Sequence, residues 1–329
     1  CPAPRKEELQ ARSFEIMTEK RFIAGIGAAN MDLHGRSRAA LILRDSNPGF
    51  LHTSPGGVTR NILENLSRMG VNTALFSAVG NDLYGREILA SGEAVGMDMS
   101  HMLRCPDCGS SSYMALIDPE GDMFIGMSDM RILEHITPEW LEEQRDALRN
   151  ADAIVCDPCL TPEALEWITS DALAGVPVFS DPVSTTYARR LAPFAGKLYC
   201  LKPNVLELAA MTGCEIANNS DMERAVDVLL ERGTHRVVVS MGQHGCYWAD
   251  RDGARFYAGL RPVSQMVDAT GAGDAFMAGL LYAYLHRFPP ERAARWALAA
   301  GIIAVTSAGT VSPGMSAELV NKILEENEL

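Results

Sequence analysis

Short apolar runs recur along this chain, and segments with helical periodicity separate them. The strand-like runs lie at residues 22–26, 73–79, 154–156, 176–180 and 237–241. The helical segments include residues 58–69, 162–172 and 221–232. Strands that alternate with helices pair in parallel, because each crossover helix returns the chain to the same end of the sheet. The pattern therefore predicts an α/β fold, with a parallel sheet covered by helices on both faces.

Two stretches depart from this alternation. Residues 41–52 and 111–127 have the polar alternation of strands, and the turn-forming residues 118–122 split the second stretch into a hairpin. We expect them to form a small β lid beside the main sheet, with strands from about 38–53 and 110–128. A single copy would leave apolar lid side chains uncovered, so we expect a homodimer through the lid or closure over a site. These side chains are Leu41, Ile42, Leu43, Met114, Leu116 and Ile125.

Composition and charge disfavour several classes of protein. The 329 residues are 47% hydrophobic and carry a formal net charge of -13. Such a charge repels nucleic acids, whose binding draws on Lys and Arg that neutralise phosphates. The charge-free stretch 296–317 becomes polar after Val305, so its apolar part is too short to span a bilayer. We expect a soluble protein with neither nucleic-acid nor membrane partners.

Eight cysteines include two Cys-x-x-Cys pairs, Cys105 with Cys108 and Cys156 with Cys159. The 47 residues between the pairs exceed the roughly 15–20 of a zinc ribbon, and no His flanks either pair. Scattered thiols without a disulfide framework are typical of a reducing compartment. We therefore expect a cytoplasmic protein without structural zinc.

Residues 268–274 form a glycine-rich segment directly before a helical run. Gly271, Ala272 and Gly273 leave backbone N–H groups unobstructed at a helix N-terminus, which suits an anion. Asp274 adds a negative charge there, which opposes phosphate unless the carboxylate accepts a proton from an attacking hydroxyl. As such a base, Asp274 should stay ionised near neutral pH because the helix N-terminus favours its charged form. Asp274 could instead cap the helix, and the residues alone leave both interpretations open.

Other nucleotide-binding motifs are absent from the sequence or incomplete. The P-loop pattern GxxxxGK[ST] occurs nowhere. Gly25 and Gly27 begin a dinucleotide fingerprint, but Asn30 occupies the position of its third glycine. The broken fingerprint argues against an NAD-dependent dehydrogenase.

Two groups in the N-terminal part suit a sugar. Asn30 and Asp32 follow the first strand, in what we expect to be a loop, and offer an amide and a carboxylate to hydroxyl groups. Gly57 allows close backbone approach, and Asn61 lies one helical turn after it. Helix capping is the alternative role for Asn30.

A third group suits a metal ion beside phosphates. Asn204 and Glu207 are three residues apart, share a helix face and could hold a hydrated divalent cation. The alternatives are capping by Asn204 and a solvated helix face for Glu207.

Together and in this order, these elements resemble the ribokinase (PfkB) family of sugar and nucleoside kinases, from about residue 21 to residue 324. The resemblance implies a parallel α/β sandwich with a small β lid. It also implies transfer of a phosphoryl group from ATP to a primary hydroxyl, with Mg²⁺. Residues 1–16 precede Met17 and would be a tag or an upstream extension, whereas residues 17–329 would be the kinase domain.

The resemblance implies a role for each group. Asp274 corresponds to the catalytic base, and the anion hole to Gly271, Ala272 and Gly273. The sugar would contact Asn30, Asp32, Gly57 and Asn61. The nucleotide would contact Asn204, Ser240, Gly242, Gly245, Thr270 and Gly273.

The resemblance also implies two cation sites. Asn204 and Glu207 would hold Mg²⁺ through water. Asp268 and Thr270, with carbonyls from residues 304–312, would hold K⁺.

Within the family, residues 44–49, 55–58, 111–113, 118 and 128–130 resemble a subgroup of bacterial kinases that act on pseudouridine. This implies a nucleoside substrate, and we expect Ser112 and Asp129 in the lid to recognise its base, because the ribose contacts cannot discriminate between substrates. The alternatives are a ribokinase or another nucleoside kinase. A non-catalytic ligand-binding regulator is a different class, and Asp274 argues against it because a pure binder gains nothing from a base opposing phosphate.

Overall fold

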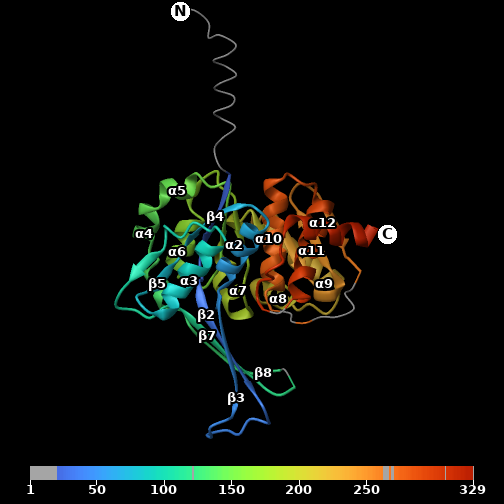
Figure 1. Cartoon of the computed structure of the whole chain (residues 1–329). Helices are drawn as coiled ribbons and strands as arrows, with labels where there is room; N and C mark the ends of the chain where they lie inside the picture. Colours follow the sequence, from blue (N-terminus) through green and yellow to red (C-terminus); the bar gives the residue numbers. More distant parts are fainter. Residues whose placement is uncertain (1–20, 121, 262–266, 268–269, 308, 329) are drawn as a thin grey trace, which may run out of the picture.

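The computed structural model describes residues 21–120, 122–261, 267, 270–307 and 309–328. The predicted extension at residues 1–16 lies outside the described residues. Figure 1 shows a broad body from which a narrow sheet projects on one side.

The body contains an eight-stranded sheet in the order β14-β13-β12-β11-β10-β9-β1-β4. The strands from β4 to β12 run parallel, whereas β13 and β14 add an antiparallel edge. Their bounds are β1 Phe22–Ile26, β4 Asn72–Phe76, β9 Ala153–Cys156, β10 Val178–Ser180, β11 Cys200–Leu201, β12 Arg236–Ser240, β13 Cys246–Asp250 and β14 Arg255–Ala258. The predicted parallel α/β sheet is confirmed, although the sequence pattern did not indicate its antiparallel edge.

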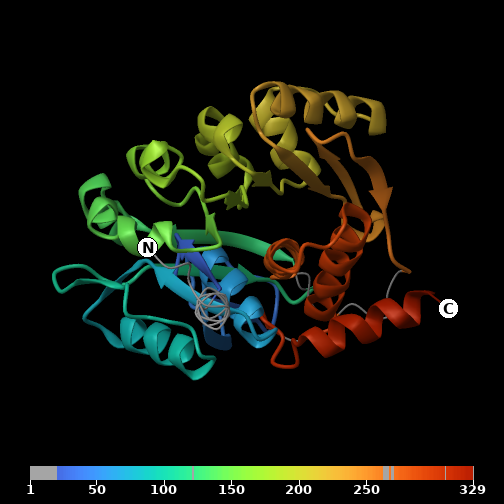
Figure 2. The same cartoon turned by 90° about the horizontal axis from the view of Figure 1, so that it is seen from above.

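Alternate residues of the same strands enter two separate apolar layers. In β1, Ile23 packs into one layer and Ala24 into the other, and in β12 Val238 and Val237 divide in the same way. Because successive side chains point to opposite faces of a strand, each layer covers one face of the sheet. Figure 2 shows helices on both sides of the sheet, as the sequence predicts.

The first layer is built from the helices α2 Val58–Arg68, α3 Leu83–Ala94, α10 Ala272–Leu285, α11 Pro290–Val305 and α12 Ala317–Glu328. The second is built from α4 Pro138–Glu143, α5 Arg145–Arg149, α6 Pro162–Ile168, α7 Thr185–Leu191, α8 Val205–Thr212 and α9 Asn219–Glu231. Short 3₁₀ helices lie at Arg131–His135, Asp171–Leu173, Ala192–Lys197 and Gly242–His244. No helix among the described residues is long and apolar enough to cross a membrane.

The strand predicted at residues 73–79 is wrong as a single element. It divides at Ser77 into β4 and β5 Ala78–Gly80, and β5 pairs with β6 Leu103–Cys105 in a separate two-stranded sheet. The Ser77 hydroxyl donates to the carbonyl of Gly27 at 2.6 Å, and its own carbonyl accepts from Leu103 N at 2.8 Å. These bonds turn the chain away from the main sheet.

The projecting sheet is the predicted lid. Its strands are β2 Asn30–Ser37, β3 Gly49–Gly56, β7 Ser112–Ile117 and β8 Met123–Asp129, in the order β3-β2-β7-β8. The hairpin of β7 and β8 agrees with the prediction, but two boundaries do not. Asn30 and Asp32 belong to a strand rather than a loop, because β2 pairs with β3 and β7 on its two sides. Residues 41–48 form a turn and loop, so the strand predicted from residue 38 or 41 begins only at Gly49.

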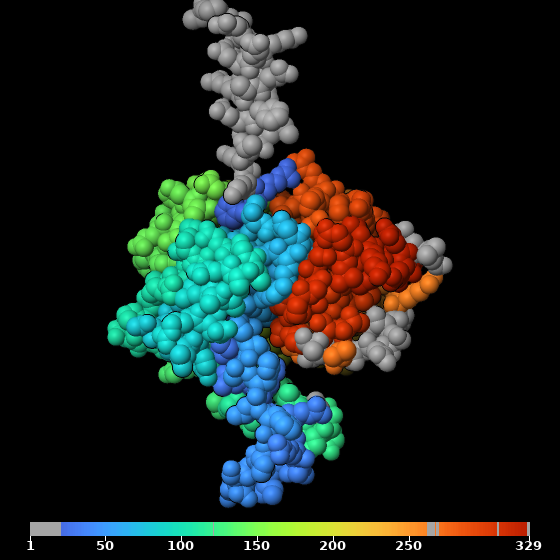
Figure 3. Space-filling model, in the orientation of Figure 1, coloured from blue at the N-terminus to red at the C-terminus, as the bar shows by residue number. Residues whose placement is uncertain are grey.

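One face of the lid is apolar and exposed, which leads to a prediction about assembly. Leu51 is 86% exposed and Met127 63% exposed, and Met114 and Ile125 share their face by strand register. The lid stands away from the body in the space-filling view (Figure 3). Burial of this face against a second copy would remove the apolar area from water. We expect sedimentation at micromolar concentration to give a dimer.

The matching variant keeps the fold and changes only this face. Leu51→Lys combined with Met127→Lys should give a monomer with an unchanged circular dichroism spectrum. A monomeric parent protein would contradict the prediction.

Candidate active site

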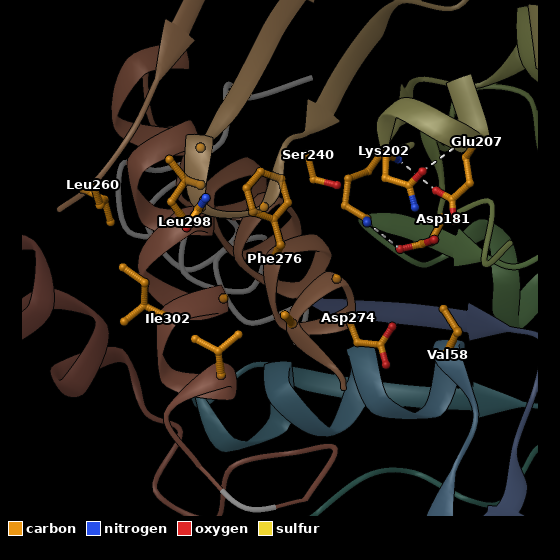
Figure 4. Close-up of a pocket in the computed structure, with 18 of the residues that line it drawn as sticks. Val58, Asp181, Lys202, Glu207, Ser240, Leu260, Asp274, Phe276, Leu298 and Ile302 are labelled. Carbon is orange, nitrogen blue, oxygen red and sulfur yellow. Dashed lines mark hydrogen bonds and ion pairs between the residues drawn. The ribbon is translucent and has the colours of Figure 1, made fainter. Parts of the chain in front are cut away.

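Polar side chains gather where the parallel strands of the main sheet end. Asp157 follows β9, Asp181 follows β10, and Lys202 follows β11. All three are buried. In an open α/β sheet, ligands bind outside the carboxyl ends of the strands. Here the N-terminus of α10 lies at the same edge, because Asp274 and Gly273 share a cavity with Asp181 and Lys202 (Figure 4).

Asp274 lies in the first turn of α10 and is 8% exposed. The Nδ2 of Asn61, from α2, donates to its Oδ2 at 2.9 Å. Gly271 is the N-cap residue and has no side-chain capping bond, so the capping interpretation of Asp274 is wrong. The carboxyl group points into the cavity instead (Figure 4).

The protonation of Asp274 differs from the expectation. Burial, followed by repulsion from the Asp181 carboxylate, raises the pKa of Asp274 to about 8, against the lowering effects of the Asn61 hydrogen bond and Lys202. The expected ionised state at neutral pH is therefore not the favoured one in the ligand-free protein. The reason is that removal of the carboxylate from water outweighs the favourable helix N-terminus.

The predicted anion hole forms the turn that starts α10. Gly271 has φ 77°, and a Cβ at this residue would lie 1.8 Å from the carbonyl oxygen of Thr310. Only glycine fits a left-handed conformation with backbone so close. Gly273 lies beside Lys202, whose Nζ would be 3.2 Å from a Cβ at that position. The free N–H groups of a helix N-terminus and an ammonium group thus lie together, an arrangement that binds phosphate oxygens.

Lys202 and Asp181 form a buried ion pair that the sequence reasoning missed. The Lys202 Nζ lies 2.9 Å from Asp181 Oδ2, and the two side chains are 4% and 7% exposed. Burial lowers the pKa of Lys202, but the attraction and hydrogen bond of Asp181, together with the charges of Glu207 and Asp274, outweigh it and leave the pKa raised. Lys202 therefore stays a cation at the cavity wall. Its only sequence signal was its place directly after an apolar strand and before Pro203.

The cavity measures about 630 Å³, within the range of small-molecule sites. One end carries Asp274 and the ion pair, and the other is apolar (Figure 4). The apolar end is lined by Leu260, Phe276, Leu298, Ile302 and Val305. Five of the six predicted nucleotide residues line this cavity, namely Asn204, Ser240, Gly242, Gly245 and Gly273, whereas Thr270 does not. The apolar end of the cavity was not predicted. A polar end and an apolar end suit phosphates and a nucleobase.

Asn204 and Glu207 form a reciprocal capping box at the start of α8. Asn204 Oδ1 accepts from the backbone N–H of Glu207 at 2.9 Å, and Glu207 Oε2 accepts from that of Asn204 at 2.8 Å. The capping interpretation of Asn204 is confirmed. Glu207 is 5% exposed rather than solvated, and burial raises its pKa. Both residues also line the cavity, where a hydrated cation could reach them.

The four predicted sugar residues come from the lid and α2. Asn30 Nδ2 donates to Asp32 Oδ1 at 2.6 Å, and both side chains are buried at the root of the lid. Gly57 precedes α2 with φ 102°, and a Cβ there would lie 2.4 Å from the carbonyl oxygen of Ala28. Asn61 joins this group to Asp274 through the hydrogen bond described above.

Asp157 links two chain segments of the site, a role that the sequence did not indicate. Its Oδ2 accepts from Ala28 N at 2.7 Å and from the Thr59 hydroxyl at 2.6 Å, and its Oδ1 accepts from Cys159 N at 3.0 Å. Asp157 therefore fixes the loop after β1 against the start of α2. It lies between Cys156 and Cys159, whose spacing suggested a test for zinc but did not indicate a role for Asp157. The described cysteines are all free thiols.

The register of the lid strands places the residues predicted to recognise the base on one face of the sheet and Asp32, predicted to bind the sugar, on the other. One row across the sheet pairs Ser54, Asp32, Tyr113 and Ser128. The neighbouring row pairs Pro55, Met31, Ser112 and Asp129. Paired residues project from one face, and adjacent rows alternate between faces. Tyr113 and Ser128 thus share the face of Asp32, whereas Ser112 and Asp129 lie on the opposite face.

Asp129 is also engaged elsewhere. Its two carboxylate oxygens accept from Arg131 at 2.9 and 2.7 Å, and these bonds lower the pKa of Asp129 to about 2. By contrast, Ser128 lies near the Tyr187 phenol of α7 and lines a pocket with it, so the Asp32 face of the lid is turned toward the body here.

The predicted K⁺ site is described only in part. Asp268 lies outside the described residues. Thr270 directly precedes Gly271, which contacts the backbone of Thr310. Val267 N donates to the Val305 carbonyl at 2.8 Å, so Val267 lies beside the end of α11.

Comparison with known proteins agrees with this geometry. Residues 20–317 match the pfkB family carbohydrate kinases. Pseudouridine kinase of Escherichia coli (strain K12) is 35% identical over 313 residues, which cover 95% of this chain and 99% of that protein. An uncharacterized sugar kinase of the same organism is 33% identical, with 95% and 86% covered. Arabidopsis thaliana ribokinase complexed with ribose and ATP has the same fold, with a TM-score of 0.82, 21% identity, and 93% and 99% covered.

The family match covers the lid and the body up to the start of α12, and it includes the segments that form the cavity. The fold is ribokinase-like, and the polar and apolar ends of the cavity suit ATP. The chain belongs to the pfkB family of carbohydrate kinases.

Proposed function

We propose that this kinase transfers the γ-phosphoryl group of ATP to the 5′-hydroxyl of pseudouridine. The observation that carries the proposal is the position of Asp274. It lines a cavity large enough for ATP, and its carboxyl group accepts a hydrogen bond from Asn61, one of the residues predicted to bind the sugar. A hydroxyl placed there meets a proton acceptor on one side and phosphate-binding N–H groups on the other.

In the proposed reaction, Asp274 takes the proton of the 5′-hydroxyl as its oxygen bonds to the γ-phosphorus. The bond from that phosphorus to the β,γ-bridging oxygen breaks, and ADP leaves with the electron pair. The N–H groups of the turn from Gly271 to Gly273, with the Lys202 ammonium, stabilise the charge on the transferred group. Asn30, Asp32, Gly57 and Asn61 orient the ribose.

The oxygen donors at the cavity wall fit Mg²⁺. Asn204 and Glu207 offer an amide and a carboxylate oxygen, and this hard cation prefers oxygen ligands and retains water. Among the described residues, no group of three or more His, Cys, Asp or Glu side chains could hold a metal ion, so the ATP phosphates would supply the remaining ligands. The bound ion would neutralise phosphate charge.

The pKa of Asp274 predicts how activity depends on pH. A base must be deprotonated, and its pKa in the ligand-free protein is about 8. With both substrates below saturation, kcat/KM should therefore rise with pH, by about tenfold per unit well below pH 8, and level off above it. Initial rates between about pH 6 and pH 9 measure this. A flat profile over that range would contradict a titrating Asp274.

The choice of pseudouridine rests on the lid. Pseudouridine differs from uridine by an N1–H donor next to its C-glycosidic bond. Ser128 and Asp129 are exposed in the ligand-free protein, and an acceptor that the bound nucleoside covers costs about 1–3 kcal/mol when that donor is missing. Ser112 and Asp129 remain predicted acceptors, but the register favours Tyr113 and Ser128, which share the Asp32 face. The similarity to E. coli pseudouridine kinase supports this substrate, whereas the comparable identity to an uncharacterized sugar kinase leaves ribokinase or another nucleoside kinase as the alternative.

A substrate panel tests the proposal. Among pseudouridine, uridine, adenosine, inosine and ribose, pseudouridine should have the highest kcat/KM, about tenfold to a hundredfold above uridine. A higher value for another acceptor would reject the substrate while leaving the kinase intact.

Variants of two adjacent lid residues then show which side chain recognises the base. Ser128→Ala should reduce the preference for pseudouridine over uridine, whereas Asp129→Asn, on the opposite face, should leave it unchanged. The reverse result would restore Asp129 as the acceptor.

We also expect a monovalent cation to raise the rate. K⁺ held near Asp268, Thr270 and carbonyls of residues 304–312 would order the turn that contains Gly271, because that turn contacts Thr310. Turnover should therefore be higher in potassium than in sodium or tetramethylammonium buffer at equal ionic strength. Equal rates in the three buffers would contradict the predicted K⁺ site.

A further inference from the structure

Arg60 is a buried cation beside the proposed catalytic centre. It is 3% exposed and directly precedes Asn61 on α2. Removal of a guanidinium from water is costly unless its donor groups find partners. In Arg60 the two terminal nitrogens find them, whereas Nε is buried without one among the described residues. The partners of Arg60 therefore show what it holds in place.

The two terminal nitrogens of Arg60 reach four different groups. Nη2 lies 2.7 Å from Glu64 Oε2 and donates to the Ser91 hydroxyl at 3.1 Å. Nη1 donates to Asn61 Oδ1 at 3.3 Å and to the Pro55 carbonyl at 3.4 Å. Arg60 thus ties together α2, α3 and the lid strand β3.

The contact with Asn61 determines which way the amide faces. A guanidinium only donates hydrogen bonds, so the amide atom that faces Arg60 must be the oxygen. The Asn61 NH₂ group is then directed to Asp274, where it donates at 2.9 Å. A donor favours the ionised carboxylate, whereas a reversed amide would present its oxygen and favour the protonated acid.

We infer that Arg60 is a positioning residue that holds the Asn61 amide in the orientation that keeps Asp274 competent as a base. The inference rests on the proposed role of Asp274. The chain of contacts runs from Glu64 through Arg60 and Asn61 to Asp274, within buried side chains.

The other charged groups near Asp274 come from different elements and do not depend on Arg60. Asp181 follows β10, Lys202 follows β11 and Asp157 follows β9, and all three influence the carboxyl group. Variants of Arg60 leave these groups in place. Arg60 also lies near Asp32, where burial raises the pKa of the carboxyl group and the charge of Arg60 lowers it. Arg60→Lys keeps the charge, so a shifted profile in this variant reports on Asn61.

The test compares the pH dependence of kcat/KM in three full-length variants, using the best acceptor of the panel with both substrates below saturation. Arg60→Met removes all donors. Arg60→Lys keeps the charge, but one ammonium cannot serve Asn61, Glu64 and Ser91 together. In both, the midpoint of the profile should move upward by about half a pH unit or more, and kcat/KM at neutral pH should fall about threefold or more. The KM for ATP should change by less than about threefold, because the nucleotide cavity is untouched.

Arg68→Met is the matched control. Arg68 donates to the other oxygen of Glu64, Oε1, at 2.7 Å from Nη2, so its loss disturbs the same carboxylate without touching Asn61. Its pH midpoint should equal that of the parent, even if the melting temperature falls. An unshifted midpoint in Arg60→Met would overturn the inference, and so would a parent-like profile in Arg60→Lys, since charge alone would then suffice. Parent-like turnover in Asp274→Asn would instead reject the proposed base itself, and with it the role inferred for Arg60, a result distinct from an unshifted midpoint in Arg60→Met.

Discussion

Replacement of Asp274 by Asn should lower kcat by about two to four powers of ten, with the dissociation constants of ATP and nucleoside nearly unchanged. The substitution removes the proton acceptor but little volume. The oxygen of the new amide can still accept from Asn61 Nδ2, as Asp274 does at 2.9 Å. The loss should therefore appear in turnover. Steady-state rates and calorimetric titration of both substrates measure the two quantities.

Thermal unfolding provides the control for this variant. A carboxyl group whose folded pKa is raised to about 8 lowers the free energy of unfolding as the pH rises from about 4 to 8, because it ionises in the unfolded chain but stays protonated in the folded one. Asn carries no such cost, so the melting temperature of Asp274→Asn should exceed that of the parent at pH 8 and approach it near pH 5. Parent-like turnover would reject Asp274 as the base, and a large fall in melting temperature would make the turnover uninterpretable.

Gly271→Ala should also abolish most activity, by about a hundredfold or more in kcat, for a different reason. Gly271 has φ 77°, and the new methyl group would lie 1.8 Å from the Thr310 carbonyl oxygen. The turn must shift to relieve this overlap, and the N–H groups at the start of α10 would move away from the phosphate. Turnover at saturating ATP measures the effect.

Gly213→Ala is a control that separates the overlap with Thr310 from the strain of a left-handed backbone. Gly213 has φ 75° at the end of α8, and a Cβ there would meet nothing within 4 Å. Both variants carry the cost of a left-handed alanine, about 1–2 kcal/mol. Gly213→Ala should lose stability but retain about the parent turnover. Similar turnover in the two variants would show that the contact with Thr310 is unimportant.

The layers of the fold follow from local sequence patterns, whereas the partners of its strands do not. Runs such as Phe22–Ile26 are buried on both faces, and the helix α2 has a strong apolar stripe, so both are visible without neighbours. The antiparallel edge and the start of β2 depend on pairing between distant segments. Asn30, for example, becomes a strand residue because it pairs with Gly56. No local pattern predicts this.

The candidate site shows the same division. Gly271, Gly273 and Asp274 are contiguous, and one motif reveals them. Lys202 and Asp181 become partners only because their strands end side by side. The assignment of Ser112 and Asp129 to the base depended on lid register, in which a shift by one residue moves a side chain to the other face.

Transfer of label from ATP tests the central claim most directly. The protein is incubated with pseudouridine, Mg²⁺ and ATP labelled in its γ-phosphoryl group, and the products are separated and identified by mass spectrometry and phosphorus NMR. The account predicts one equivalent of label on the 5′-oxygen of pseudouridine per ADP formed, and almost none with Asp274→Asn. Release of the label only as inorganic phosphate, or its appearance on another oxygen, would contradict the account.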